Sequence, residues 1–348
     1  MQRSRANAVK APRISFRKDH RLELVLCELI VSAARDSCWY RITAVMSRGL
    51  GCDKNRRYLQ PMARVAFPKR FPALKPAIEE LKILERHWQT RSSAYRLEQT
   101  AHTLLRTTVF SQHHSLLRRR LGESDPSMQL GKLHNLRLAA PKFAHLRLES
   151  GQTLSFWKVL GRASSRNGFV DGMLIADGRA VEGVGGGLCQ LANLLYWMAL
   201  HSPLTIAEHH HHSLDLFPDS GRVLPFGSGA SVYYNYIDLQ LHNPTPHALG
   251  LHVWLADTHL HGTLWTDAAH PYSYKVRERD HCFYRRSDGA IYRSNTLEQH
   301  QYDRRTGQLL TRCVITHNDS RVLYAPSADT VILPSRGLGA SNALESQP

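Results

Sequence analysis

The feature that most restricts how this chain can fold is a run of three glycines, Gly185, Gly186 and Gly187, followed at once by an apolar stretch. Glycine accepts positive φ angles and close backbone approach, so the run predicts a tight turn. The apolar residues behind it recur at the spacing of one helical face: Leu188, Leu191, Leu195 and Met198. We therefore expect a glycine turn that leads the chain into the N-terminus of a helix.

Cys189 falls in the first turn of this expected helix. The first N–H groups of a helix have no intrahelical partner, and the helix dipole is positive at that end. A thiol placed there tends to have a lowered pKa and a larger thiolate fraction, as nucleophiles and metal ligands require. Cys189 is therefore the first candidate for a reactive side chain.

A histidine-rich segment follows the helix, and residues 204–217 are interpreted as a strand. The two-residue period of a strand places every second side chain on one face: Ile206, Glu208, His210, His212 and Leu214. That face would hold one carboxylate and two imidazoles, which together with a cysteine are the groups of a thiol site.

These residues leave three interpretations open. In the first, Cys189 is a nucleophile, His210 or His212 is its base, and a carboxylate such as Asp238 orients the imidazole. Backbone N–H groups at the helix start would form an oxyanion hole, with Gln190 as a further donor.

In the second interpretation, the Cys189 thiolate and the two histidines bind a catalytic zinc ion, and Glu208 is a base or fourth ligand. In the third, Cys189 is a small buried side chain and the glycines only allow tight packing. Our hypothesis is the first: it gives catalytic roles to Cys189, His210, His212, Asp238 and Glu208, and it needs neither a metal nor another cofactor.

Several ordered motifs resemble the VanW family, which is named for a vancomycin-resistance cluster. They are residues 155–157 (Ser-Phe-Trp), 185–191 (Gly-Gly-Gly-Leu-Cys-Gln-Leu), 208–213 (Glu-His-His-His-His-Ser), 217–220 (Phe-Pro-Asp-Ser), 225–230 (Pro-Phe-Gly-Ser-Gly-Ala) and 234–239 (Tyr-Asn-Tyr-Ile-Asp-Leu). The resemblance extends over roughly residues 111–326. One departure is that the family usually has an arginine after the glutamate, where this chain has His209.

The resemblance implies a role in glycopeptide resistance or cell-envelope metabolism, with a peptidoglycan precursor or cell-wall peptide as the partner. Combined with the thiol site, it implies a Cys/His enzyme that acts on a peptide or amide. The alternative is a non-catalytic binding or accessory protein for a cell-wall peptide or a partner protein. The candidate substrate-binding residues lie in the matching motifs: Gly185, Gly186, Gly187, Gln190 and Ser155.

The net charge of +16 belongs to the first 140 residues, because residues 141–348 hold equal numbers of acidic and basic side chains. The motif-bearing part is therefore not basic, and we expect no nucleic-acid partner. Three consecutive arginines, Arg118, Arg119 and Arg120, fit the end of a helix, where cations suit the dipole. A phosphate or polyanion site is the alternative for them.

The cysteine pattern and the hydropathy bear on location. The six cysteines form no CxxC pair, which favours free thiols in a reducing compartment. No apolar run has the ~20 residues that a membrane-spanning helix needs. We expect a cytoplasmic protein without a transmembrane segment.

The overall pattern predicts an α+β fold. A basic, partly helical N-terminal extension (1–95) precedes a mixed, strand-rich domain (96–326) in which the glycine-led helix packs on a sheet, and a tail (327–348) follows. Within the domain we expect a motif core at 146–256 and a second strand group at 273–326.

Local patterns give more specific expectations. Residues 74–88 predict an amphipathic helix with one apolar face: Ile78, Leu81, Leu84 and Trp88. Residues 95–121 show a second helical pattern. Strands are expected at 231–241 and 249–255, and a hairpin is expected to turn at Asp288 and Gly289.

Overall fold

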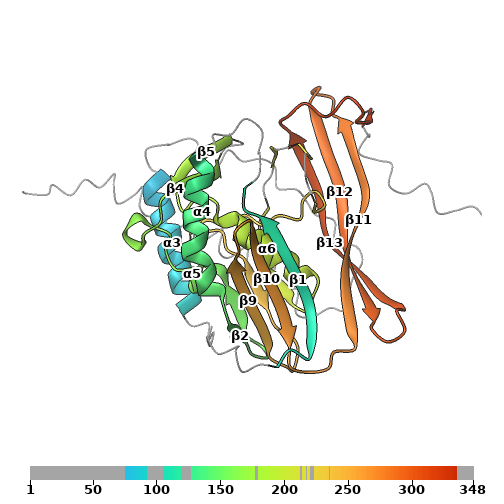
Figure 1. Ribbon diagram of the computed structural model, residues 1–348. Coiled ribbons are helices and arrows are strands. Elements are labelled where there is room, and N and C mark those ends of the chain that lie inside the picture. The colour runs from blue at the N-terminus through green and yellow to red at the C-terminus, as the bar shows by residue number, and fades with distance from the viewer. Residues whose placement is uncertain are drawn as a thin grey trace, which may run out of the picture. The chain divides into compact units, whose positions relative to one another are not determined.

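The computed structural model describes residues 75–91, 105–118, 127–176, 179–211, 214–216, 218–219, 223–234 and 236–334. All of them belong to one compact unit, residues 67–348. This unit combines helices with several sheets, so the predicted α+β class is confirmed (Figure 1). The described part contains no helix that is both long and apolar enough to cross a membrane.

A four-stranded antiparallel sheet carries the main core. Its strands, in spatial order, are β1 (Thr108–Leu116), β10 (His259–Thr266), β9 (Leu249–Leu255) and β2 (Leu146–Leu148). The glycine-led helix α6 (Leu188–Leu200) packs on one face of this sheet (Figure 1). The predicted helix and the predicted strand at 249–255 are thus both confirmed.

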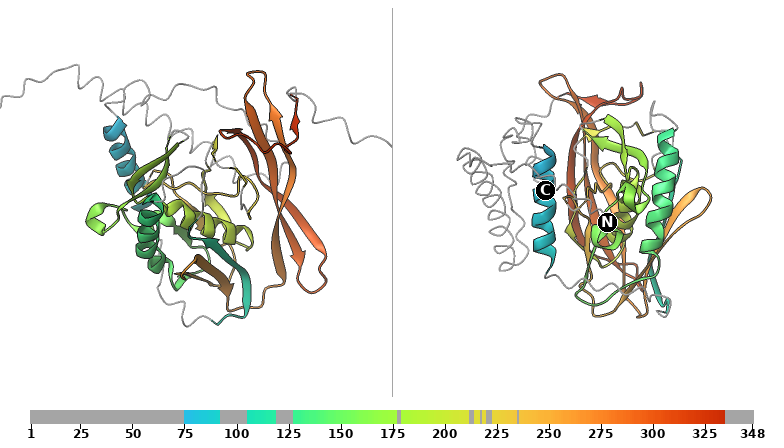
Figure 2. Two further views of the ribbon diagram at one scale, coloured as in Figure 1. Left: turned by 45° about the horizontal axis from the view of Figure 1, so that its top comes forward. Right: turned by 90° about the vertical axis from the view of Figure 1, so that its left-hand side faces the viewer.

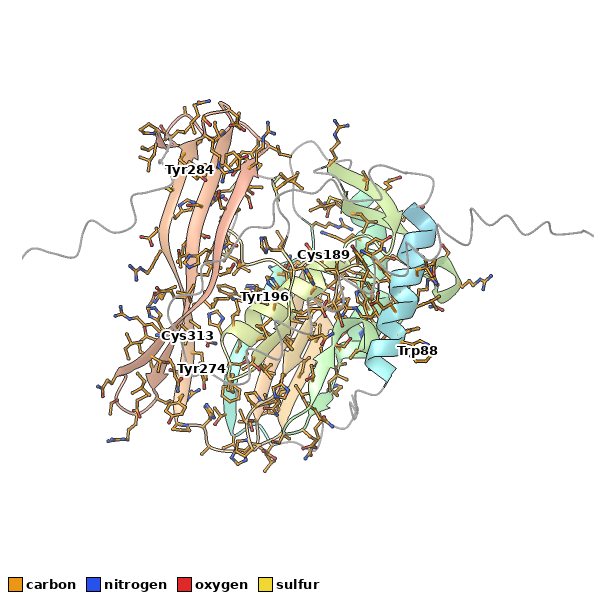
Figure 3. All side chains as sticks on the ribbon, turned by 180° about the vertical axis from the view of Figure 1, so that it is seen from behind. Trp88, Cys189, Tyr196, Tyr274, Tyr284 and Cys313 are labelled. Atoms are coloured by element: carbon orange, nitrogen blue, oxygen red, sulfur yellow. The ribbon has the colours of Figure 1, made fainter. Side chains whose placement is uncertain are left out.

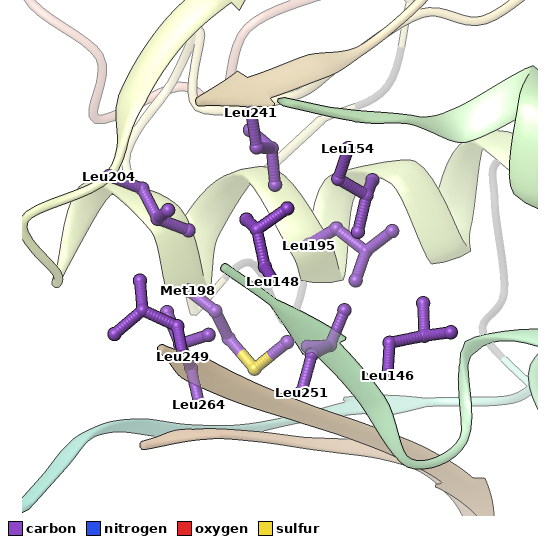
Figure 4. A pocket seen from close by; sticks show the side chains of 10 residues that line it. All are labelled: Leu146, Leu148, Leu154, Leu195, Met198, Leu204, Leu241, Leu249, Leu251 and Leu264. Carbon is purple, nitrogen blue, oxygen red and sulfur yellow. The ribbon is translucent and has the colours of Figure 1, made fainter. Parts of the chain in front are cut away.

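Aliphatic side chains fill the space between α6 and the sheet. They include Leu195 and Met198 from the helix and Leu251 and Leu264 from the strands, all buried (Figure 4). Burying a side chain of this kind stabilises a fold by about 1.5–3 kcal/mol. The gap left among them has a volume of only about 10 Å³ and is lined by apolar groups, so it is a packing defect and not a ligand site.

Shorter elements surround this core. The helices are α3 (Lys75–Arg91), α4 (Ser127–Ala139) and α5 (Phe156–Leu160), with 3₁₀ turns at η3 (Ala140–Phe143) and η4 (Ser165–Asn167). A three-stranded sheet joins β3 (Thr153–Ser155), β8 (Gln240–His242) and β6 (Thr205–Glu208), and β4 (Asp171–Ala176) pairs with β5 (Arg179–Val184).

The C-terminal strand group forms a second large sheet. Its spatial order is β14 (Ile332–Leu333), β11 (Tyr272–Arg285), β12 (Ile291–Asp303), β13 (Leu309–Val322) and β7 (Leu214–Asp215). Three of these strands are long and twist about one another (Figure 2). The hairpin between β11 and β12 turns at Asp288 and Gly289, as predicted. The Gln299 amide of β12 donates to the carbonyl of Leu200 at the end of α6, at 2.9 Å.

The helical pattern at 95–121 was a wrong prediction where the structure describes it. Residues Thr108–Leu116 form β1, an outer strand of the four-stranded sheet, and pair with β10 from end to end except at an irregularity between Val109 and Ser111. Pairing with β10 satisfies the backbone groups on one side of this segment and overrides its local helical spacing. Residues 95–104 and 119–121 lie outside the described residues.

The predicted strand at 231–241 was also largely wrong. Tyr233 and Ile237 pair through an isolated bridge, the N–H of Tyr236 donates to the carbonyl of Tyr233, and only Gln240 and Leu241 enter β8. The aromatic residues here have the composition of a strand, but the side chain of Asp238 binds backbone N–H groups and pulls the chain out of extended geometry.

Helix α3 forms as predicted but presents a different face to the domain. Leu81, Leu84 and Trp88 are 52, 55 and 81% exposed, whereas Ile83 is 8% exposed. The docked face carries Ile83 and Arg86, because an ion pair to Glu208 orients the helix. Apolar periodicity alone does not reveal such a polar anchor.

Candidate functional site

The glycine turn places the start of α6 in contact with two other elements. Gly187 caps the helix at φ 95°, in the left-handed region that favours glycine. Gly186 lies against the backbone of Gly172 in β4, so closely that a Cβ would sit 2.1 Å from its carbonyl. The Asn135 amide of α4 donates to the carbonyl of Gly186 at 3.0 Å. Gly186 and Gly187 therefore serve packing, while Gly185 lines a cleft.

This cleft, here called the Cys189 cleft, has a volume of about 380 Å³ and is bounded by α3, α5, the start of α6 and residues 232–234. Figure 3 marks the position of Cys189 within the fold. The lining is mostly aromatic and aliphatic, with one cation and one anion: Glu80, Ile83, Trp157, Arg162, Ala163, Leu174, Val184, Gly185, Leu188, Cys189, Val232, Tyr233 and Tyr234.

Cys189 is partly buried in the wall of this cleft. Within the described ranges, its sulfur has one hydrogen-bond acceptor, the carbonyl of Val232 at 4.0 Å, and no imidazole within hydrogen-bond distance. Burial raises the pKa of the Cys189 thiol, and the hydrogen bond to Val232 offsets this only in part. The desolvation of the sulfur thus outweighs the helix-terminal effect that the sequence suggested.

Glu208 lies at the end of β6 and is the centre of a polar network. The Arg86 guanidinium donates to both carboxylate oxygens, at 2.5 and 2.7 Å, and also to the carbonyl of Tyr236 at 3.0 Å. The Gln240 amide and the Asp238 N–H each donate to Glu208 at 3.0 Å. Burial opposes ionisation, but hydrogen bonds from His210 and Arg86 and the charge of Arg86 lower the pKa of Glu208 to about 2.

Asp238 is the second carboxylate of this network and is 2% exposed. The Ser155 hydroxyl donates to it at 2.5 Å, and the N–H groups of Trp157 and Leu239 donate at 3.2 and 2.9 Å. Burial raises the pKa of Asp238 despite the hydrogen bond from Ser155, and the charge of Glu208 raises it further. Ser155 also accepts from the N–H of Lys158 as the N-cap of α5, so the pair fixes the wall that carries Trp157.

The histidine run does not form the expected strand. Strand β6 ends at Glu208, and residues 209–211 have no regular structure, while Leu214 belongs to a strand of the other large sheet. The turn away from the sheet lets His209 stack on Tyr196, with ring centroids 3.9 Å apart. His212 lies outside the described residues.

The two described histidines next to Glu208 have different roles. His209 donates from Nε2 to the carbonyl of Gly229 at 2.8 Å, and burial lowers the pKa of His209 to about 4. His209 is therefore neutral at pH 7 and does not replace the arginine that the family usually has after the glutamate. The cation that pairs with Glu208 is Arg86. His210 contacts Glu208 at 3.2 Å, and no hydrogen bond among the described residues joins it to Cys189. In the described ranges, no group of three His, Cys, Asp or Glu is arranged to hold a metal ion.

Comparison with known proteins identifies the family. A family model described as "VanW like protein" matches residues 131–265. The chain is 31% identical over 200 residues to the vancomycin B-type resistance protein VanW of Enterococcus faecalis, covering 58% of this chain and 72% of that protein. The chain belongs to the VanW family. A second relative, the uncharacterized protein YoaR of Bacillus subtilis, is 26% identical over 117 residues, which is 34% of this chain and 37% of YoaR. No solved structure matches.

The stretch matched by the VanW model holds most of the site but not all of it. It includes the glycine turn, Cys189, Glu208 and Asp238, whereas α3 precedes it and supplies Glu80, Ile83 and Arg86. One wall of the Cys189 cleft therefore comes from outside the matched VanW stretch. The resemblance noted in the sequence gave no indication of this wall.

Two VanW motifs have clear structural partners. The 225–230 loop is held by amides that bind its backbone: Asn295 donates to the carbonyl of Phe226 at 2.8 Å, and Asn193 accepts from the N–H of Ala230 at 2.6 Å. Gln190, predicted to contact a substrate, donates to Ser115 and to the carbonyl of Leu116, both at 2.9 Å. It thereby joins α6 to β1.

Sequence reasoning missed Arg86, Arg162 and Gln240. Arg162 lies in the polar loop after α5 and pairs with Glu80 across the cleft at 2.8 Å. Gln240 bridges the two carboxylates, at 3.0 Å to Glu208 and 3.3 Å to Asp238. For Arg86, the available signal was the presence of charged residues between the apolar positions of residues 74–88.

Proposed function

We propose that this VanW-family chain binds a peptide of the cell envelope in the Cys189 cleft and contributes to glycopeptide resistance through that binding. The observation that carries the proposal is the lining of the cleft, which combines apolar and aromatic walls with one exposed cation, Arg162, and one exposed anion, Glu80. Clefts of a few hundred Å³ with few, well-placed polar groups are typical of small-ligand sites.

The charges of the cleft favour a peptide with a free carboxylate. Arg162 presents a planar fork of donors that matches a carboxylate. Its present partner, Glu80, is 55% exposed and Arg162 is 52% exposed, so their ion pair is worth at most about 1 kcal/mol. A ligand carboxylate can therefore displace Glu80, which then remains available for an ammonium group of the same ligand. The rings of Tyr233, Tyr234 and Trp157 supply the apolar contact.

The name of the enterococcal relative supports the biological part of the proposal, since it refers to vancomycin resistance. A peptidoglycan precursor or cell-wall peptide has the carboxylate and the aliphatic side chains that the cleft suits. In this proposal the Glu208–Asp238 network has a positioning role, because it binds Arg86 of α3, which forms one wall, and the Tyr236 carbonyl close to the wall residues Tyr233 and Tyr234.

Replacing Arg162 with glutamine should weaken peptide binding. The probe is a soluble peptidoglycan stem peptide, compared with the same peptide amidated at its C-terminus, by calorimetry. We expect amidation to reduce affinity about tenfold or more in the wild type, the usual cost of losing a charge-assisted hydrogen-bond pair. Arg162→Gln should bind both peptides equally weakly.

The control for this experiment is Arg166→Gln. Arg166 is exposed on η4, four residues along the chain, and does not line the cleft. It should retain wild-type discrimination between the two peptides. Equal affinity of the wild type for free and amidated peptide would refute the carboxylate assignment, and undetectable binding of both would refute the peptide-binding proposal.

A thiol-dependent enzyme is the second candidate, because Cys189 does line the cleft at a helix N-terminus. In that case Cys189 would act with His210 or His212, and Asp238 or Glu208 would orient the base. The binding proposal is preferred because burial desolvates the Cys189 sulfur, and no described imidazole lies within hydrogen-bond distance of it to act as a base.

Thiol labelling separates the two candidates. Cys313 is exposed and serves as an internal reference in the same molecule. We expect Cys189 to react at least about tenfold more slowly than Cys313 at pH 7.5, because burial and a raised pKa both reduce its accessible thiolate. Peptide mapping by mass spectrometry assigns each labelled site. Faster reaction of Cys189 than of Cys313, together with loss of resistance in Cys189→Ser, would favour the enzyme.

A further inference from the structure

Three imidazoles gather on the face of the four-stranded sheet that points away from α6. His114 comes from β1, and His259 and His261 come from β10. Their ring centroids lie 5.1 Å (His114 to His259), 5.8 Å (His114 to His261) and 5.8 Å (His259 to His261) apart. We call these three residues the histidine cluster. It is separate from the Cys189 cleft, and neither the VanW motifs nor the proposed function accounts for it.

Strand register explains why the cluster forms. His114 is directly opposite His261, and Leu116 is directly opposite His259. Side chains that face each other across neighbouring strands, or lie on the adjacent diagonal, come within contact distance on one face. Trp254 of β9, opposite His261, stacks on its ring at 5.1 Å and supports that side of the cluster.

An arginine follows β1 in the chain, near the turn that precedes His259. The N–H of Leu117 donates to the carbonyl of Thr258, so the chain leaves β1 beside the β9–β10 turn, and the next residue is the exposed Arg118. Arg118 begins the three-arginine run whose alternative interpretation was a polyanion site; Arg119 and Arg120 lie outside the described residues. Arg118 follows strand β1 and does not end a helix. An interaction with a helix dipole therefore does not explain its position.

We propose that His114, His259 and His261, with Arg118 beside them, form a site for a phosphate group. Each imidazole carries an N–H donor, and a phosphate offers three strong acceptor oxygens. A tetrahedral anion above the triangle can present one oxygen to each ring. A metal ion needs nitrogen lone pairs that converge on one point, and within the described part of the chain no such group exists.

Binding depends on the charge of the rings. Burial and the charges of His114 and His259 lower the pKa of His261, so His261 resists protonation when no anion is bound. A bound anion favours the protonated form of a neighbouring imidazole, so anion affinity is expected to be highest at low pH and to fall as pH rises. The other ionisable groups around the cluster are Arg118 after β1 and Asp257 in the β9–β10 turn, with His252 and His145 further along the sheet face.

Sulfate and phosphate are the probes for this site. Sulfate is a tetrahedral anion whose charge stays constant between pH 5.5 and 7.5, so it reports protonation of the protein alone. We expect sulfate affinity, measured by imidazole-detected NMR titration, to rise about tenfold from pH 7.5 to 5.5 for each proton taken up. Pyrophosphate should compete with sulfate, and the ring resonances of the three cluster histidines should shift together.

Variants locate the site. His114→Gln and His261→Gln should each reduce anion affinity about tenfold or more at pH 5.5, without changing the unfolding transition. His317→Gln is the matched control, because His317 is exposed on the other large sheet, where its ring forms a hydrogen bond with Thr296. It should bind as the wild type does.

Two further measurements decide the outcome. Vesicles with an anionic phospholipid, compared with free pyrophosphate, show whether a lipid headgroup can supply the phosphate; cluster-dependent binding of either supports the proposal. No cluster-dependent binding of any phosphate or sulfate at pH 5.5 overturns it. The proposal is also overturned if the wild type binds Zn²⁺, His114→Gln does not, and neither protein binds an anion.

Discussion

Replacing Gly186 with alanine should destabilise this protein by about 3 kcal/mol or more, the range of severe overpacking. The added Cβ would lie 2.1 Å from the carbonyl carbon and oxygen of Gly172 and 2.6 Å from the nitrogen of Met173. These are backbone atoms of β4, which cannot rotate away as a flexible side chain could. The glycine turn must then move, and with it the start of α6 and Cys189.

Urea denaturation monitored by tryptophan fluorescence measures this effect, provided that both variants unfold in one transition. Gly229→Ala is the matched control within another VanW motif, because its Cβ would meet nothing closer than Asn193 at 3.4 Å, an ordinary contact. We expect the control to change stability by no more than about 0.5 kcal/mol. Equal stability of the two variants would show that the triplet is not held against β4.

Replacing Arg86 with alanine should remove the main anchor of α3 and leave Glu208 without its cation. The two side chains are 20 and 13% exposed, so the loss lies below the 3–5 kcal/mol of a fully buried pair; we expect about 2 kcal/mol. The wall that supplies Glu80 and Ile83 should then open. Hydrogen exchange in α3 and faster thiol labelling of Cys189 report that opening.

The same pair gives a signature in acid. The pKa of Glu208 is lowered from 4.5 to about 2, so its contribution to stability is present above pH 4.5 and is lost as pH falls towards 2. The shift corresponds to about 3 kcal/mol in the wild type. The Arg86→Ala variant should lose less stability than this over the same pH range, because without Arg86 the ionised Glu208 carboxylate already stabilises the fold less.

Two controls make the Arg86 result specific. Glu80→Gln, on the same helix, removes a partner from an exposed pair and should cost less than about 1 kcal/mol. The double variant Arg86→Ala with Glu208→Gln should recover part of the loss, since the buried charge is gone. Unchanged hydrogen exchange of α3 in Arg86→Ala would contradict an anchoring role for this pair.

Regular elements with a strong local signal were predictable. The glycine turn and α6 follow from glycine conformational freedom and the apolar period of residues 188–198, and β9 follows from a short apolar run between turn residues. The hairpin at Asp288 and Gly289 follows from turn chemistry. In each case the local residues and the tertiary environment require the same conformation.

The sequence pointed to several candidate residues that lie near one another, but not to their arrangement. Glu208, His210, Ser155 and Asp238 do meet, through a contact of Glu208 with His210 and a hydrogen bond from Ser155 to Asp238. No described contact joins them to Cys189, whose environment is set by desolvation and by Val232. Nothing in the spacing of the histidines shows that β6 ends at Glu208.

By itself, the sequence determined the VanW kinship, the α+β class and the glycine-led helix, because these depend on residue types at short range. Only the tertiary structure decided which groups share a site. Arg86 reaches Glu208 across 122 residues, and His114 meets His261 across an antiparallel strand pair. Burial and pairing between distant segments set the charge state of Cys189 and Glu208. A local sequence pattern does not show which side chains lose contact with water when the chain folds.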